Sequence, residues 1–212
     1  MKVEVWSDIG CPFCFIGKRN FEAALKNFAH GSEVEIVMKS FELDPYAKNN
    51  TGLTTYQMLS NKYSMSLEQA KQMTESVAQR GKEAGLIFNF DKAIHANTFD
   101  AHRLLHFAKT QDKQLELQEK LFAAHFTEGM DVGDKGTLIQ LATEAGLLKI
   151  DVENVLTTEA FRNEVRHDEN QAKELGLNGV PAFLIDNKYL VSGAQPVKVF
   201  LDALNKAWEN KA

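Results

Sequence analysis

The stretch SDIGCPFCFIGK, residues 7–18, holds both cysteines of the chain, Cys11 and Cys14, with one proline and one phenylalanine between them. The preceding residues 2–6, KVEVW, alternate apolar and polar side chains as a half-buried β-strand does. After the first cysteine, apolar side chains recur at helical intervals, at Phe15, Phe21, Leu25 and Phe28. Pro12 suits the first turn of a helix, where its missing N–H has no partner to lose. The cysteine pair is therefore predicted to lie where a strand passes into a helix.

The rest of the chain divides into a long helical part and a second strand-forming part. Residues 33–41, EVEIVMKSF, predict a strand that completes a strand–helix–strand unit. Residues 53–175 show helical periodicity, and their charged run at 162–174 is typical of a solvated helix face. Strand signals return at 181–185 and 188–191 around an Asp186-Asn187 turn, and Pro196 opens a last helix at 197–208. We expect an α/β fold built from residues 1–50 and 176–212, interrupted by an all-helical insertion domain at 51–175.

The composition is that of an ordinary globular protein and narrows the classes of partner. The chain has 212 residues, of which 44% are hydrophobic and 25% charged, enough to bury a sizeable core. Its net charge of −5 offers no basic surface for nucleic acid. No apolar run approaches the ~18 residues of a membrane span, and the N-terminal residues do not resemble a secretory signal. We predict a cytoplasmic protein with no nucleic-acid partner and no membrane partner.

Two cysteines this close together allow three interpretations. A permanent disulfide would be unusual in the cytosol and would close too small a loop to stabilise the fold much. A structural zinc site needs four ligands, so His95, His102, His106 or a second subunit would have to complete one cysteine pair. A redox dithiol is the interpretation that fits a cytosolic Cys-x-x-Cys beside a strand–helix–strand unit. The redox pair is preferred, and no metal site is predicted.

Five motifs, in order along the chain, resemble the DsbA-like thioredoxin-fold oxidoreductases, and specifically their FrnE-type cytoplasmic branch. They are CPFCFIGK at 11–18, Asn97-Thr98 with AHRL at 101–104, Leu121-Phe122 ahead of Phe126, GVPAF at 179–183 and VSGAQP at 191–196. The resemblance implies a thioredoxin fold with a large helical insertion. It also implies that the Val180–Pro181 peptide bond is cis and faces the cysteines, where it would leave backbone groups free to pair with an extended substrate. From the residues alone, a trans proline at the start of a strand is equally acceptable.

The expected chemistry is thiol–disulfide exchange through a mixed disulfide. Cys11, predicted to be the more exposed of the pair, is the nucleophile, and Cys14, one turn further into the helix, is the resolving thiol. A helix N-terminus favours thiolate over thiol. Phe13 stands where periplasmic DsbA enzymes typically carry a histidine, and it cannot donate a hydrogen bond to the thiolate. We therefore expect a reduction potential between the ~−270 mV of thioredoxin and the ~−120 mV of DsbA.

Further residues are candidates for a supporting role. Pro12, Phe13, Val180 and Pro181 are predicted to form the substrate groove. Trp6 and Phe13 are interpreted as apolar contact surface next to the disulfide, with a core position as the alternative for Trp6. Asn97 is expected to cap a helix at 98–109. His102, four residues before His106 on the same helix, is expected to pack near the active site.

Two other function classes share this expected architecture. Kappa-class glutathione transferases and 2-hydroxychromene-2-carboxylate isomerases have a serine where Cys11 stands, and glutathione would then be a co-substrate. A peptide-binding chaperone switched by its dithiol is the non-enzymatic alternative. The predicted cofactor is none beyond the redox-active disulfide, and the predicted partners are protein or small-molecule thiols and disulfides. Monomer and homodimer both remain open, because Phe200, Leu204 and Trp208 could cover the sheet or a second subunit.

Overall fold

A four-stranded mixed sheet lies at the centre of the computed structural model, which describes residues 1–49 and 53–210. The strands are β1 (Lys2–Ser7), β2 (Glu35–Ser40), β3 (Ala182–Ile185) and β4 (Tyr189–Ser192), in the order β2-β1-β3-β4. β1 is parallel to β2 and antiparallel to β3, which is antiparallel to β4. The two ends of the chain thus build one sheet, as in a thioredoxin fold, and the α/β class expected from the sequence is confirmed.

The parallel pair β1 and β2 is joined by α1 (Pro12–Asn27), followed by the short η1 (Gly31–Glu33). Cys11 is the N-cap of α1, and Pro12 occupies the first helical position, where proline is favoured. The predicted strand at 33–41 is shorter in the structure because η1 takes its first residue and β2 ends at Ser40. At the β3–β4 turn, Asp186 and Asn187 both have positive φ, 51° and 54°, as a tight two-residue hairpin requires.

Helices fill the interval between β2 and β3. They are α2 (Thr55–Tyr63), α3 (Leu67–Glu83), α4 (Phe99–Lys109), α5 (Gln114–Ala123), η2 (Ala124–Glu128, a π-helical turn), α6 (Lys135–Glu144), α7 (Lys149–Thr157) and α8 (Arg162–Glu174). The last helix, α9 (Val197–Glu209), returns to the sheet. No helix among the described residues is both long enough and apolar enough to cross a membrane.

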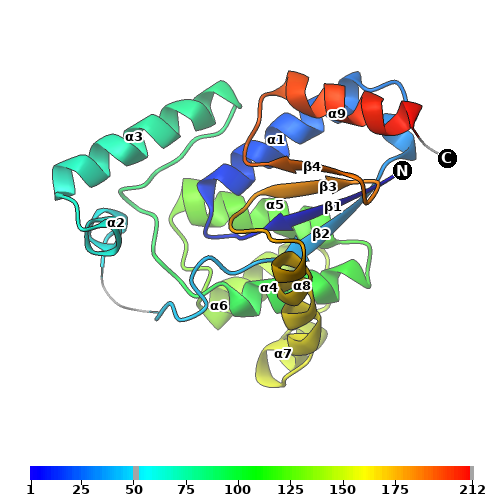
Figure 1. Cartoon of the computed structure of the whole chain (residues 1–212). Coiled ribbons are helices and arrows are strands. Elements are labelled where there is room, and N and C mark those ends of the chain that lie inside the picture. Colours follow the sequence, from blue (N-terminus) through cyan, green and yellow to red (C-terminus); the bar gives the residue numbers. More distant parts are fainter. Residues whose placement is uncertain (50–52, 211–212) are drawn as a thin grey trace.

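One face of the sheet is covered by α1 and α9, which run alongside each other in Figure 1. Phe200 and Leu204 of α9 are fully buried here, in one cluster with Phe21 and Phe183. The ring of Trp208 stacks on His30 at a centroid distance of 4.0 Å. The apolar side chains of the last helix therefore cover the sheet of their own chain, and the oligomeric state stays a prediction.

Helix α1 also contributes to a second apolar cluster, formed mostly by the insertion. Cys11, Cys14, Phe15 and Ile16 belong to it, and the ring of Phe15 stacks on Phe122 of α5 with the centroids 4.9 Å apart. The cysteine turn is thus packed between the sheet and the inserted helices. The domain division at 51–175 remains a prediction, and its first boundary lies at residues 50–52, outside the described part of the chain.

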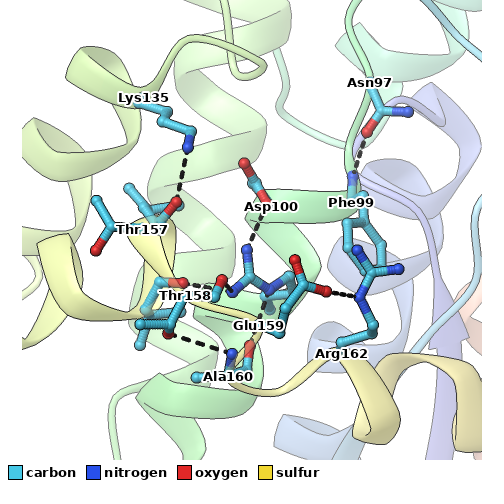
Figure 2. A network of polar contacts seen from close by, with 12 residues as sticks. Asn97, Phe99, Asp100, Lys135, Thr157, Thr158, Glu159, Ala160 and Arg162 are labelled. Atoms are coloured by element: carbon cyan, nitrogen blue, oxygen red, sulfur yellow. Dashed lines mark hydrogen bonds and ion pairs between the residues drawn. The ribbon is translucent and has the colours of Figure 1, made fainter.

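Arg103 of α4 holds the inserted helices together, and its partners Asp100, Thr158 and Ala160 are labelled in the polar network of Figure 2. Its guanidinium is buried and donates to the carbonyl oxygens of Val155, Thr158 and Ala160 and to the carboxylate of Asp100. Two of these carbonyls belong to the C-terminal turn of α7 and the residue that ends it, where helices leave acceptors unpaired. Arg103 thereby fixes α4 against the turn between α7 and α8.

Candidate redox site at the start of helix α1

Cys11 lies at the point where the β1–α1 turn enters the helix. Its backbone N–H donates to the Asp8 carbonyl oxygen at 3.1 Å, and its own carbonyl accepts from the Cys14 N–H at 3.0 Å. The Cys11 thiol donates to the carbonyl oxygen of Val180 at a sulfur–oxygen distance of 3.6 Å. Cys11 is 4% exposed, so it is only slightly more accessible than Cys14. The helix N-terminus and the Val180 carbonyl therefore define the surroundings of this sulfur.

Cys14 lies one turn further into α1 and is 2% exposed. Both cysteines are free thiols in this structure. The Cys14 sulfur accepts a hydrogen bond from the Asp8 N–H at 3.5 Å. Burial raises the pKa of the Cys14 thiol well above its ordinary value, and the neighbouring Cys11 raises it further. Cys14 is thus held as a protonated thiol next to the sulfur of Cys11.

Asp8 anchors the turn that carries the cysteines. One of its carboxylate oxygens accepts from the Gly10 N–H at 3.2 Å and the Thr98 hydroxyl at 2.8 Å, and the other accepts from the Leu43 N–H at 2.7 Å. The His102 Nε2 lies 3.4 Å from the same carboxylate. Burial would raise the pKa of the Asp8 carboxyl, but His102, the Leu43 N–H and Thr98 outweigh burial and hold it below its ordinary value.

The segment before β3 forms the opposite wall. The Val180–Pro181 peptide bond is cis, the isomer that the resemblance implies. The Pro181 carbonyl accepts from the Gly193 N–H at 2.7 Å. Gly17 of α1 packs so close to this segment that a Cβ there would lie 2.9 Å from the Pro181 Cγ. A glycine is therefore required at this contact between α1 and Pro181.

Pro12 and Phe13 lie with Cys11 along a cavity of about 340 Å³. Phe13 is half-buried, and the Arg80 guanidinium of α3 lies over its ring, 4.9 Å from the centroid. Arg80 also donates to the Ala194 carbonyl oxygen at 3.3 Å. The dipeptide between the cysteines is thus in contact with the insertion.

Trp6 is a core residue, and its interpretation as contact surface is wrong. It is 1% exposed on β1, and its indole N–H donates to the Asp168 carbonyl oxygen of α8 at 2.9 Å. It packs with Ala172, Leu177 and Ala182, and Val180 packs against the same cluster. A tryptophan in β1 is buried here because α8 covers this side of the sheet. Trp6 therefore belongs to the apolar cluster against which Val180 packs.

Asn97 and His102 both lie where the insertion meets the site. Asn97 immediately precedes the N-cap residue Thr98, yet its side chain accepts from the Phe99 N–H at 3.0 Å, as Figure 2 shows. It also donates to the Ala47 carbonyl oxygen at 3.3 Å, which ties the loop after β2 to the start of α4. His102 is 1% exposed, and its Nε2 lies 3.4 Å from the carboxylate of Asp8, the residue that anchors the cysteine turn.

His106 is directed elsewhere, to the Asp168 carboxylate at 3.1 Å. Among the described residues, no three His, Cys, Asp or Glu side chains form a group that could hold a metal ion. The i,i+4 spacing of His102 and His106 therefore does not bring them to one shared site.

Two residues of the site have no counterpart among the sequence candidates. Asp8 stands in the stretch that opens the helix, but nothing in the pattern distinguishes a buried aspartate from a turn residue. His125 is buried in η2 and lines the cavity, yet in sequence it is a lone histidine on an apolar helix face. The burial of Asp8 and His125 beside the cysteines follows only from the packing of the insertion against α1.

Residues 2–205 match the model of the DSBA-like thioredoxin domain. The chain belongs to the DSBA-like thioredoxin family. Its relatives include the uncharacterized protein YwbO of Bacillus subtilis (strain 168), 30% identical over 211 residues, which are 99% of this chain and 98% of the relative.

Solved structures agree with this assignment. A probable DsbA oxidoreductase, SCO1869 of Streptomyces coelicolor, is 42% identical and superposes with a TM-score of 0.96 over 100% of this chain and 92% of that chain. A 2-hydroxychromene-2-carboxylate isomerase shares the fold at 13% identity, with a TM-score of 0.72 over 99% of this chain and 97% of that chain. The thioredoxin fold with its helical insertion is therefore shared with both.

Proposed function

We propose that this protein is a thiol–disulfide oxidoreductase that works through a reversible Cys11–Cys14 disulfide. The observation that carries the proposal is the unequal environment of the two sulfurs. The Cys14 sulfur accepts from the Asp8 N–H, and the pKa of its thiol is raised. Cys11 is the N-cap residue of α1 and lines a cavity. Membership of the DSBA-like family supports the same class of activity.

The reaction takes place in two exchange steps. The Cys11 thiolate attacks a substrate disulfide, forming a mixed disulfide and releasing one substrate thiolate, which takes up a proton. Cys14 then loses its proton and attacks the Cys11 sulfur, releasing the second substrate thiolate and leaving the Cys11–Cys14 disulfide. Two electrons pass from the protein dithiol to the substrate, and the reverse sequence oxidises a substrate dithiol.

Pro12, Phe13, Val180 and Pro181 are proposed as the groove for an extended substrate. The Cys11 sulfur lies 3.6 Å from the Val180 carbonyl oxygen, so a substrate sulfur bonded to Cys11 would lie next to that backbone segment. An extended chain there could pair with the backbone of Val180, whose carbonyl oxygen accepts from the Cys11 thiol in the free protein. The FrnE-type branch, the cytoplasmic location and the intermediate reduction potential belong to the same proposal, with protein or small-molecule disulfides as partners.

Cysteine variants test the proposal directly. Incubated with a disulfide substrate, Cys14→Ser is expected to accumulate covalent mixed disulfides through Cys11, since the resolving thiol is gone. Cys11→Ser is expected to form none and to show no exchange. The double variant is the control for unspecific adducts on non-reducing gels and by mass spectrometry. Adducts on Cys11→Ser but not on Cys14→Ser would reverse the two roles.

A glutathione-dependent isomerase or transferase is the second candidate, favoured by the cavity next to Cys11 and the shared isomerase fold. Such an enzyme needs one activated group and no resolving thiol. Turnover with glutathione and an electrophile that survives Cys14→Ser would support this candidate. Loss of turnover in the same variant would support the oxidoreductase.

A further inference from the structure

The cavity next to Cys11 extends from the redox pair into the insertion. Its volume of about 340 Å³ lies within the range of small-molecule sites. It is lined by Cys11 and Phe13, by Met58 of α2 and Val77 of α3, and by Phe126 of η2. Val180 and Pro181 are not among the residues that line it. Cys11 therefore faces two separate sites, a backbone edge at Val180 and this cavity.

The buried part of the lining offers a ligand apolar contact and few hydrogen bonds, and its charged residues Lys62 and Asp44 are exposed or partly exposed. Methionines from α2 and α3, Met58 and Met73, give a lining that adapts to ligand shape. The threonines along the wall already have partners, since Thr55 donates to the Ala93 carbonyl at 2.8 Å and Thr98 to Asp8 at 2.8 Å. A charged or strongly polar molecule would lose its hydration in this buried part without equivalent hydrogen bonds in return.

His125 is the exception among the buried polar residues of the lining. It is 6% exposed, and its Nδ1 is buried without a hydrogen-bond partner among the described residues. Buried polar atoms are nearly always paired, so an unpaired one in a cavity wall points to a missing partner. Burial lowers the pKa of the imidazole to about 4, with a smaller contribution from His95, and His125 is therefore neutral near pH 7. A neutral imidazole suits an uncharged ligand with a single hydrogen-bonding atom.

We infer that the cavity binds the organic group of a small, uncharged, mainly apolar disulfide, with one hydrogen-bonding atom at His125 and one sulfur at Cys11. The inference rests on the proposed function and specifies its substrate class. The Cys11 thiolate attacks the near sulfur, the sulfur–sulfur bond of the ligand breaks, and its far half leaves as a thiolate that takes up a proton. Cys14 then displaces the near half, and the ligand has been reduced to two thiols by the protein dithiol.

The inference is tested with 2,2′-dithiodipyridine, a compact aromatic disulfide whose released thione absorbs light. Reduced protein is mixed with this probe or with charged glutathione disulfide, and single-turnover rates are followed by stopped flow. Met58→Trp, which fills the cavity from α2, is expected to slow the aromatic probe about tenfold or more and to change the glutathione disulfide rate less than about twofold. Asn61→Trp, on the exposed side of α2, is the matched control and should change neither rate.

The role of His125 is tested by a second comparison. The exchange rates with 2,2′-dithiodipyridine and with diphenyl disulfide, which lacks the ring nitrogens, are measured for both proteins. The ratio of the first rate to the second is expected to be larger for wild type than for His125→Phe. The ratio in the variant corrects for the different intrinsic reactivity of the two probes. Equal ratios in the two proteins would overturn the assignment of His125.

Binding without exchange separates this inference from the proposed function. Cys11→Ser lacks the attacking thiol of the proposed reaction, yet calorimetry should detect 2,2′-dithiodipyridine binding to it and a marked loss of binding when Met58→Trp or Val77→Phe is added. Circular dichroism selects the folded variants. The cavity inference is overturned if Cys11→Ser does not bind the probe. It is also overturned if binding to Cys11→Ser is unchanged when Met58→Trp or Val77→Phe is added. Absence of any exchange in wild-type protein, with binding intact, overturns only the oxidoreductase proposal.

Discussion

His125 and Asp8 are buried beside the same cavity, and both make the fold sensitive to acid. The folded pKa of His125 is about 4, against about 6.5 in an unfolded chain, because burial disfavours the charged imidazole. As the pH falls below about 6.5, the unfolded state binds this proton first, so the free energy of unfolding decreases. The difference corresponds to about 3 kcal/mol, lost progressively until the pH reaches about 4.

His125→Phe is therefore expected to flatten the stability profile between pH 6.5 and pH 4. Urea unfolding at a series of pH values measures the effect. The exposed His167→Gln is the control and should follow wild type. Parallel curves for wild type and His125→Phe would contradict the buried neutral state of this histidine.

Asp8→Asn is expected to cost about 2–4 kcal/mol at pH 7, because an amide N–H₂ would face groups that now donate to the carboxylate. The pKa of Asp8 lies below its ordinary value, so this stabilisation is present above about pH 4 and is lost as the pH falls through the lower folded value. The gap between wild type and variant should therefore narrow in acid. Asp44→Asn, on a more exposed carboxylate, should cost much less. A gap that stays constant from pH 7 to pH 2 would refute this account.

The cysteine pair could be predicted from local spacing, but the residues that set its environment could not. The sequence predicts a helix start at Cys11 and Cys14, because the two-residue period of a strand changes there to the period of a helix. The burial of Asp8 depends on Leu43, Thr98 and His102, which no local pattern connects to it. Trp6 was ambiguous for the same reason, since α8 decides whether its side of β1 is covered.

Helix α1 depends on a glycine contact with the Pro181 segment. In Gly17→Ala, the new Cβ would lie 2.9 Å from the Pro181 Cγ and 3.4 Å from the Phe183 Cζ. Alanine favours a helix by up to about 1 kcal/mol over glycine, but the rigid proline ring cannot move away. We expect a net loss of about 1–3 kcal/mol in the free energy of unfolding and slower disulfide exchange.

Gly179→Ala is the matched control for Gly17→Ala, because a Cβ at Gly179 meets nothing within 4 Å. Denaturant unfolding and exchange kinetics should leave this control close to wild type. A Gly17→Ala protein as stable and as active as the control would show that α1 can move away from Pro181 without cost.

The sequence predicts the helices and strands that have a clear hydrophobic period, but it predicts less well which of their polar side chains are buried. The hairpin around Asp186 and Asn187 follows from turn chemistry, and α9 follows from Pro196 and its apolar stripe. The run at 162–174 is a helix as expected, but its predicted solvated face is interrupted by Asp168, which is 2% exposed and pairs with Lys39 of β2 at 2.9 Å. A charge buried in an ion pair has the same sequence pattern as one in water, so the error could not be avoided from the sequence.

The insertion and the sheet share apolar clusters, and we expect them to unfold together. Trp6 reports on their contact, since its indole is bonded to Asp168 of α8. In a Trp208→Phe variant, the fluorescence of Trp6 and the far-UV circular dichroism of the helices should follow one coincident urea transition. A helical signal lost at lower urea than the Trp6 signal would show that the insertion unfolds as a separate unit. The division of the chain at 51–175 would then be a thermodynamic boundary as well as a topological one.

The strand order has a consequence for biosynthesis. Strand β1 lies between β2, which follows it closely in the chain, and β3, which begins at Ala182. At translation rates of about 5–20 residues per second, the roughly 170 residues between Cys14 and β3 take about 10–30 seconds to emerge. During that interval the nascent chain carries both thiols without the Val180–Pro181 wall, and one edge of β1 is unpaired. Newly made thiols of this protein are thus accessible to cellular oxidants and to other nascent cysteines before the mature site can select its substrates.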